Sequence, residues 1–313
     1  MRFPFKAAGL VAALLATVAA AAPPQRIVPD MAREDRWAEQ VAPDIVVGDV
    51  VWLSTKLRPK VLAIYTRPPG TAKAAVIVVH GLGVNPDWEV IGVLRTALAD
   101  RGFATLSVQM PVLAADAPPA DYVALYPEAG ARLSAALAWL HERGYAKVAI
   151  VSHSLGAAMT DAWLAHAAAG SGGSGIAAWV PLGMAVPFSK RPRMPVLDVV
   201  ASSDLPAVVA SNPARVAELP ADGCSRAVTI QSTDHFYAGA QTRLIDTIAP
   251  FLSEVFDGRC GAARTAQRQS RSSSRPAVAR ASRSRTAAHA RSSGTASIRI
   301  ASAPAASRAR RFA

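Results

Sequence analysis

The chain reads Val-Ala-Ile-Val-Ser-His-Ser-Leu-Gly over residues 148–156. An apolar run typical of a buried strand stops at a serine, and a helix-forming run follows over residues 157–169. Ser154 has a small residue two positions away on each side, Ser152 and Gly156. A strand, a sharp turn carrying a serine and then a helix make up a nucleophile elbow, in which strand and helix pass close together. The stretch therefore predicts both a fold and a nucleophile.

Two observations leave another interpretation of Ser154 open. The first small residue of such a turn is usually glycine, and here it is Ser152. A serine after a strand is also a common N-cap residue of a helix. The partners of the serine must therefore be found elsewhere in the chain.

Apolar runs alternate with helical stretches on both sides of this segment. Strands are expected at residues 50–55, 61–67, 74–79, 104–109, 147–151, 177–182, 196–201 and 227–231. Helices are expected at residues 88–101, 129–143, 157–169 and 241–256. The alternation predicts an α/β fold with a mostly parallel central sheet and helices on both faces. The first two strands, joined by a short turn, predict an antiparallel edge, and no insertion is large enough for a cap domain.

The start of the chain has the composition of a secretory signal peptide over residues 1–22. Arg2 and Lys6 precede an apolar run that ends in alanines at 19–21. A membrane anchor is the alternative, but the run is shorter than the roughly 20 residues that a spanning helix needs. We therefore expect a periplasmic or secreted protein, with no transmembrane anchor after cleavage. Residues 23–47 are polar and predict an irregular lead-in to one domain at 48–257.

The net charge of +12 belongs to the end of the chain. Residues 258–313 contain 13 arginines and no Asp or Glu, which leaves 21 basic and 22 acidic side chains before them. This Arg/Ser/Ala-rich segment lacks the apolar content of a packed structure, so we expect a disordered basic tail. It could bind an anionic envelope surface, or it could be solvated without a partner. The almost complete lack of aromatic residues there argues against a specific nucleic-acid partner.

Two cysteines, Cys224 and Cys260, are the only ones in the chain. An oxidising compartment would allow them to pair, but two free thiols are equally compatible with the sequence. No group of His and Cys residues has the spacing of metal ligands, so we expect no metal site.

The base that activates the serine should be a histidine later in the chain, on a loop after a strand. His235 fits, because it lies between the expected strand at 227–231 and the last helix. The acid should follow a strand between the two, and Asp204 does. Asp198, inside that strand, and Asp234, beside the histidine, are the competing carboxylates.

Acyl transfer also needs hydrogen-bond donors for an oxyanion. One is expected at the backbone N–H of Leu155, directly after the serine. The second is expected at the N–H of Leu82, in the His80-Gly81 loop that follows the strand at 74–79. A plain turn at the end of a strand is the alternative for His80 and Gly81.

These segments, in their type, order and spacing, resemble the α/β-hydrolase superfamily. The resemblance covers residues 60–257 and is to a small, exported and poorly characterised bacterial branch. It implies an eight-stranded sheet, a triad of Ser154, Asp204 and His235, and no cofactor.

The sequence thus predicts an exported serine hydrolase of the carboxylesterase or lipase type. It would cleave an ester or thioester of a small-molecule or lipid-like substrate through an acyl-enzyme. The alternative is a catalytically silent envelope-binding protein of the same fold, in which the basic tail carries the interaction.

Overall fold

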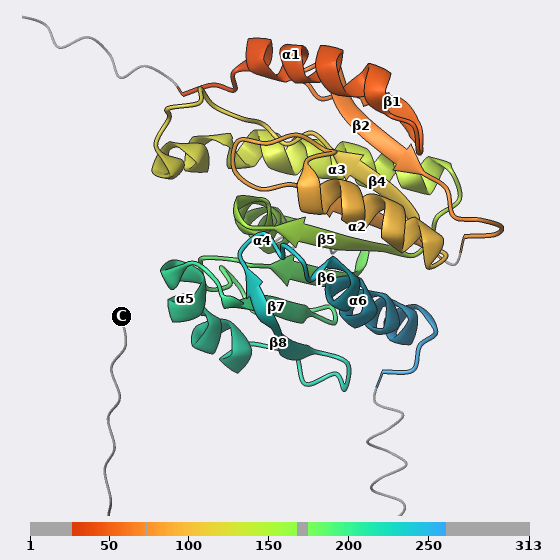
Figure 1. Ribbon diagram of the computed structural model, residues 1–313, viewed down its shortest axis with the longest axis vertical. Coiled ribbons are helices and arrows are strands. Elements are labelled where there is room, and N and C mark those ends of the chain that lie inside the picture. Colours follow the sequence, from red (N-terminus) through yellow and green to blue (C-terminus); the bar gives the residue numbers. More distant parts are fainter. Residues whose placement is uncertain (1–26, 73, 168–174, 261–313) are drawn as a thin grey trace, which may run out of the picture. The chain divides into compact units, whose positions relative to one another are not determined.

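The computed structural model describes residues 27–72, 74–167 and 175–260. They form an eight-stranded sheet in the order β1-β2-β4-β3-β5-β6-β7-β8 (Figure 1). The strands are β1 Asp49–Leu53, β2 Val61–Thr66, β3 Ala75–Val79, β4 Ala104–Val108, β5 Val148–His153, β6 Ile176–Leu182, β7 Leu197–Ser203 and β8 Arg226–Asp234. β2 pairs antiparallel with β1 and β4, and all other neighbours are parallel. The predicted mostly parallel sheet with an antiparallel edge is confirmed.

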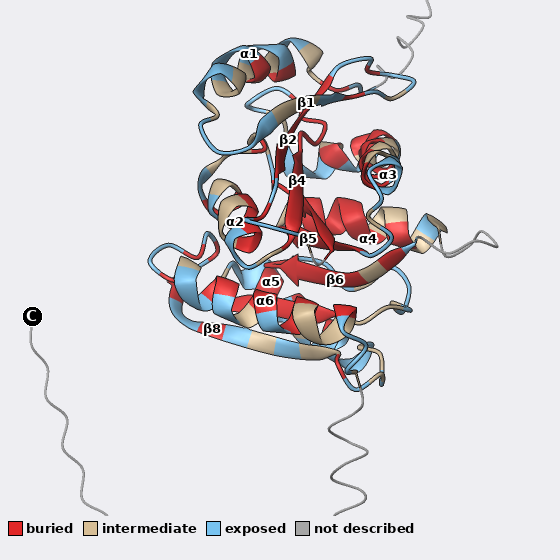
Figure 2. Cartoon of the chain, turned by 90° about the vertical axis from the view of Figure 1, so that its right-hand side faces the viewer, coloured by how far each residue is buried: buried red, intermediate tan, exposed pale blue. Residues whose placement is uncertain are grey.

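Helices cover both faces of this sheet (Figure 2). They are α2 Glu89–Asp100, α3 Tyr126–Glu142, α4 Leu155–Ala167, α5 Pro206–Ala217 and α6 Gln241–Phe256. Ile77 and Val79 of β3 belong to the core cluster of α3 and α4, whereas Val76 and Val78 belong to that of α2 and α6. Successive side chains of a strand point to opposite faces, so a strand buried on both faces must be apolar throughout.

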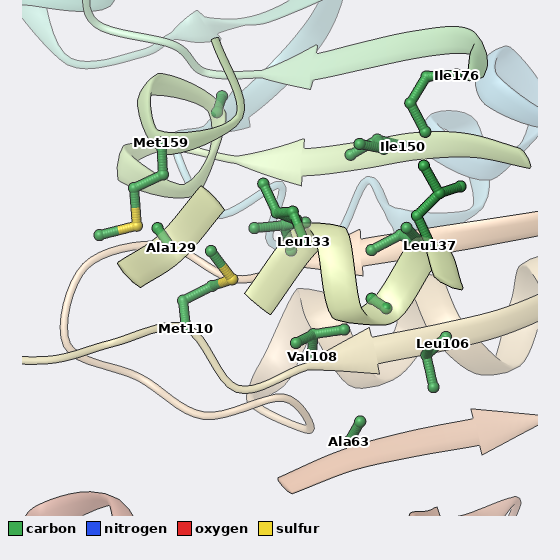
Figure 3. Packing of buried hydrophobic residues seen from close by; sticks show 14 of the residues in the cluster. Ala63, Leu106, Val108, Met110, Ala129, Leu133, Leu137, Ile150, Met159 and Ile176 are labelled. Carbon is green, nitrogen blue, oxygen red and sulfur yellow. The ribbon is translucent and has the colours of Figure 1, made fainter. Parts of the chain in front are cut away.

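The core beneath α3 holds the strands in place. Leu133 and Leu137 of α3 pack among residues of β4 and β5, including Val108 and Ile150 (Figure 3). Burying a leucine side chain contributes about 1.5–3 kcal/mol. The packed core thus fixes the positions of the strand ends from which the loops at the sheet edge start.

The expected irregular lead-in at 23–47 is wrong for residues 31–44, which form helix α1, Met31–Val41, and the 3₁₀ turn η1, Ala42–Asp44. The side chain of Asp30 caps the helix by accepting the N–H of Arg33 at 2.9 Å. The carboxylate of Glu34 is buried and pairs with Arg58 at 3.2 Å and Arg132 at 3.0 Å. The buried face of α1 combines the charged Glu34 with Ala38, so the helix lacks a continuous apolar stripe that would make it stand out in the sequence.

Two further helical segments have no counterpart among the expected elements. They are α5 and the 3₁₀ segment η2, Pro119–Leu125. Pro213 lies inside α5, and η2 begins with a proline at its first position. Proline is a poor residue for a helix interior, so the sequence pattern of both segments favours a loop.

A disulfide joins Cys224, just before β8, to Cys260, just after α6. The pairing that the sequence left open therefore closes a segment that contains β8 and α6. Within the described ranges, no helix is long and apolar enough to cross a lipid bilayer. The expected signal peptide at 1–22 and the expected tail, apart from residues 258–260, lie outside the described residues.

Candidate active site

Five neighbouring parallel strands end at one edge of the sheet, and the residue directly after each strand lies in the candidate site. These residues are His80 after β3, Ser154 after β5, Gly183 after β6, Asp204 after β7 and His235 after β8. The carboxyl ends of parallel strands meet at one edge, which is where open α/β sheets bind ligands. The fold thus brings together residues that are far apart in the sequence.

Ser154 lies in a strained turn between β5 and α4. Its φ of 54° is in the left-handed region, which costs a non-glycine residue free energy. Its N–H donates to the carbonyl of Leu182 in β6 at 2.8 Å, which fixes the turn to the next strand. A Cβ on Gly156 would lie 2.1 Å from the carbonyl oxygen of His80. Only glycine therefore allows α4 to begin at this point.

Ser152 has a specific partner at the position where glycine is usual. Its hydroxyl accepts the indole N–H of Trp179, in β6, at 2.8 Å, and the serine side chain is fully buried. A buried indole N–H needs an acceptor, and glycine at 152 would supply none. Serine rather than glycine at position 152 thus gives the buried indole N–H of Trp179 its acceptor.

The three residues predicted as a triad are hydrogen-bonded in series. Nε2 of His235 lies 2.8 Å from Oγ of Ser154, and Nδ1 of His235 lies 2.6 Å from Oδ1 of Asp204. An ionised carboxylate accepts the Nδ1 proton, which leaves Nε2 free to accept the serine hydroxyl. This is the tautomer that general-base catalysis by His235 requires.

Asp204 is held in its ionised form by its hydrogen bonds. Burial alone would raise the pKa of this carboxyl. The bond from His235 and the N–H groups of Ala201 and Leu205, each at 2.9 Å, outweigh that effect and keep the pKa below its usual value. The carboxylate therefore stays charged at neutral and mildly acidic pH.

The two expected oxyanion donors belong to Leu155, directly after Ser154, and to Leu82, which lines a common cavity with Ser154. Among the described residues, no loop, turn or strand carbonyl accepts the N–H of Leu82, and Leu155 is the first residue of α4, so no preceding turn of helix accepts its N–H. Gly81 lies against the serine, since a Cβ on Gly81 would be 3.0 Å from Cβ of Ser154. Both backbone N–H groups are thus available near the nucleophile.

His80 positions the loop that carries Leu82. Its Nε2 accepts the N–H of Met110 at 2.8 Å, so Nδ1 carries the proton and donates to the carbonyl of Gly81 at 2.9 Å. Burial lowers the pKa of His80 to about 4, so the ring is neutral at pH 7. The carbonyl of the Gly81–Leu82 peptide is therefore held by a neutral side chain.

A cavity of about 270 Å³ opens at Ser154 and His235. Its apolar lining consists of Leu82, Val84, Trp88, Leu205 and Phe236. The rings of Trp88 and Phe236 meet edge to face, with 5.5 Å between their centroids.

Lys190, Arg191 and Arg193 line a different cavity, beside Asp161 of α4.

Sequence reasoning missed two residues of the site. Gly183 has a φ of 57°, and a Cβ there would lie 2.9 Å from the ring of His235. His153 donates from Nε2 to the backbone carbonyl of His235 at 2.9 Å, and the two rings lie 4.9 Å apart. A glycine directly after a buried strand was the available signal for Gly183, and nothing in the sequence indicated a role for His153.

The competing carboxylates have other partners. Asp198 is buried and pairs with Arg215 of α5 at 3.0 Å. Asp234 accepts the N–H of Phe236 at 3.0 Å and so shapes its own turn. Among the described residues, no group of three or more His, Cys, Asp or Glu side chains is placed to hold a metal ion.

Solved structures with a similar fold include α/β hydrolases. An α/β serine hydrolase homologue from Coxiella burnetii matches with a TM-score of 0.52 and 16% identity, over 66% of this chain and 98% of that one. The chain has the α/β-hydrolase fold. A dienelactone hydrolase from Anabaena variabilis matches this fold with a TM-score of 0.53 and 21% identity, over 66% and 97% of the two chains. A serine hydrolase without a lid from Xanthomonas campestris matches with a TM-score of 0.52 and 17% identity, over 69% of this chain and 96% of that one.

Comparison of the sequence with family models gives a match over part of the chain. A family model described as a protein of unknown function (DUF3530) matches residues 10–131, a range that includes α1 and the His80 loop but ends before Ser154. No curated protein sequence matches the chain.

We predict that His80 and His153 remain neutral down to about pH 4. Burial lowers the pKa of both rings from 6.5 to about 4. Their contribution to stability is therefore complete above pH 6.5 and is lost as the pH falls towards 4, because the unfolded chain binds protons first. A ¹⁵N NMR titration should show Nδ1–H on His80 and Nε2–H on His153 throughout that range. Protonation of either ring near pH 6.5 would contradict the burial and bonding described above.

A second prediction concerns the hydroxyl at the elbow. Ser152→Gly should lower the free energy of unfolding by about 1–3 kcal/mol, because it leaves the Trp179 N–H buried without an acceptor. Trp179→Phe removes that donor, so the double variant should lose less than the sum of the two single variants. Urea unfolding of the four proteins measures this coupling, and strictly additive losses would show that the bond contributes nothing.

Proposed function

We propose that this protein is an exported serine hydrolase that cleaves esters or thioesters through an acyl-enzyme. The observation that carries the proposal is the hydrogen-bond series from Asp204 through His235 to Ser154, at the carboxyl edge of the sheet. The N–H groups of Leu155 and Leu82 add the donors that such a reaction needs. Solved hydrolases with the same fold are compatible with this chemistry, although a fold alone does not establish it.

In the first half of the reaction, the hydroxyl of Ser154 attacks the carbonyl carbon of the ester. His235 takes the hydroxyl proton on Nε2, and Asp204 stabilises the imidazolium that forms. The carbonyl oxygen becomes an oxyanion, which the N–H groups of Leu155 and Leu82 stabilise. The bond to the leaving group then breaks, and His235 returns the proton to the departing alcohol or thiol.

In the second half, water replaces the leaving group. His235 takes a proton from the water as its oxygen attacks the acyl carbon, and the same two N–H groups stabilise the second oxyanion. The bond between the acyl carbon and Oγ of Ser154 breaks, and the proton returns to the serine. The products are a carboxylic acid and the free enzyme.

The cavity favours a short and uncharged acyl or alcohol group. Its volume of about 270 Å³ is below the roughly 300–1,000 Å³ of typical small-molecule sites. Apart from Ser154, His235 and the neutral ring of His153, the lining is apolar, and it offers no charged side chain to a substrate carboxylate. Buried charge without a partner is costly, so charged acyl groups should be rejected.

Export remains part of the proposal. The disulfide between Cys224 and Cys260 supports it, because disulfides persist mainly in oxidising compartments. The leader that would direct export lies outside the described residues.

The proposal predicts preferential hydrolysis of short p-nitrophenyl esters. The kcat/KM for the acetate and butyrate should exceed that for the decanoate and for the charged hemisuccinate by at least about tenfold, the discrimination expected of a pocket that excludes a few methylenes or a charge. Asp204→Asn should lower kcat by about 10⁴-fold, and Ser154→Ala and His235→Ala should each lower it by about 10⁶-fold, as removal of the corresponding triad member does.

A neighbouring exposed hydroxyl serves as the control. Ser203→Ala, next to Asp204, should keep wild-type activity. Equal rates for wild type and Ser154→Ala would contradict the hydrolase and favour the alternative of a silent binding protein.

A further inference from the structure

Helix α1 lies beside the antiparallel edge of the sheet (Figure 1). Its Arg33 side chain nevertheless contacts the loop that carries Leu82. The guanidinium of Arg33 bridges two loops. Its Nη1 donates to the carbonyl of Leu113 at 2.7 Å, and its Nη2 donates to the carbonyl of Gly83 at 3.0 Å. One side chain of α1 thus joins the loop after β4 to the loop after β3.

Arg33 is itself held in place. Its backbone N–H is bonded to Asp30, whose own N–H donates to the carbonyl of Val112 at 2.8 Å. The guanidinium also lies 4.5 Å from the ring centroid of Trp37, one turn further along α1. The side chain therefore meets the loop from a fixed position.

A second path runs from α1 to the same loop through buried side chains. Glu34 pairs with Arg132 of α3, whose Nη1 donates to the carbonyl of Gln109 at 3.0 Å. The side-chain nitrogen of Gln109 lies 3.1 Å from Nε2 of His80. Two neighbouring residues of α1 thus reach the His80 loop, one directly and one through this network.

Hydrogen bonds from His80 and Arg33 restrain the peptide groups on both sides of Leu82. Nδ1 of His80 donates to the carbonyl of Gly81, and Arg33 donates to the carbonyl of Gly83. A peptide is planar, with its N–H opposite its carbonyl, so fixing the Gly81 carbonyl sets the direction of the Leu82 N–H. Gly83 has a φ of 65°, a conformation that glycine can easily leave unless the bond from Arg33 restrains it.

We infer that Arg33 is a positioning residue for the oxyanion donor at Leu82, which makes α1 a working part of the active site. The inference rests on the proposed function. Oxyanion donors act because they are already oriented when charge develops, so a loosened donor should slow chemistry more than it weakens substrate binding.

The test compares Arg33→Ala and Arg33→Lys with Arg36→Ala, an exposed arginine on the same helix. With p-nitrophenyl butyrate, Arg33→Ala should lower kcat about 10- to 100-fold, less than the 10²–10³-fold loss of a complete donor. KM should change less than about threefold. Arg33→Lys keeps the charge but loses the two-nitrogen fork that spans the two carbonyls, so it should fall in between, while Arg36→Ala should match wild type.

Two further readouts separate positioning from a general loss of stability. Hydrogen exchange of the backbone at residues 80–88 should be at least about tenfold faster in Arg33→Ala, with β5 and β6 unchanged. Added methylguanidinium should restore part of the lost kcat in Arg33→Ala and none in Ser154→Ala.

The outcomes are distinguishable. If wild type hydrolyses esters and Arg33→Ala retains its kcat and its exchange rates, the inference is wrong and the proposed function stands. A loss of kcat without faster exchange at 80–88 would also overturn it. If wild type hydrolyses no ester, the proposed function fails and the inference fails with it.

Discussion

The start of α4 touches the end of β3, and this contact sets the geometry of the whole site. A Cβ on Gly156 would lie 2.1 Å from the carbonyl oxygen of His80, so the helix and the strand end approach as closely as a backbone allows. The approach places Gly81 against Ser154, and with it the loop that carries Leu82. The nucleophile Ser154 and the expected oxyanion donor at Leu82 thus follow two strands that are neighbours in the sheet, although the two residues are 72 positions apart in the sequence.

Buried polar groups then hold this arrangement in one geometry. Arg132 is fully buried and pairs with both Glu34 and Glu128, and His80 and His153 are buried and neutral. Buried ion pairs are weak evidence for stability, because desolvation offsets much of their attraction. Their directional bonds do fix loop carbonyls and N–H groups, and a site of this kind depends on such groups being oriented in advance.

The sequence alone predicted the strands and helices whose apolar pattern results from burial, and it predicted the candidate site residues that directly follow strands. β3 is apolar throughout because helices cover both its faces, and such a run is recognisable in the sequence. A nucleophile turn has to follow a strand, which pointed to Ser154. The histidine of the triad comes later in the chain and after a strand, which pointed to His235. Helix α1 could not be found in this way, because Glu34 docks it by charge and its partners are distant in sequence. The acceptor that Ser152 provides for Trp179 also depends on a contact between neighbouring strands that no local pattern reveals.

The most direct measurement is covalent labelling with a fluorophosphonate, followed by peptide mass spectrometry. A serine that is activated by His235 should be labelled at one site, Ser154, with one adduct per chain, and His235→Ala should slow the labelling strongly. Ser154→Ala should carry no adduct. The absence of an adduct on the folded wild-type protein, or an adduct of equal yield on Ser154→Ala, would contradict the account.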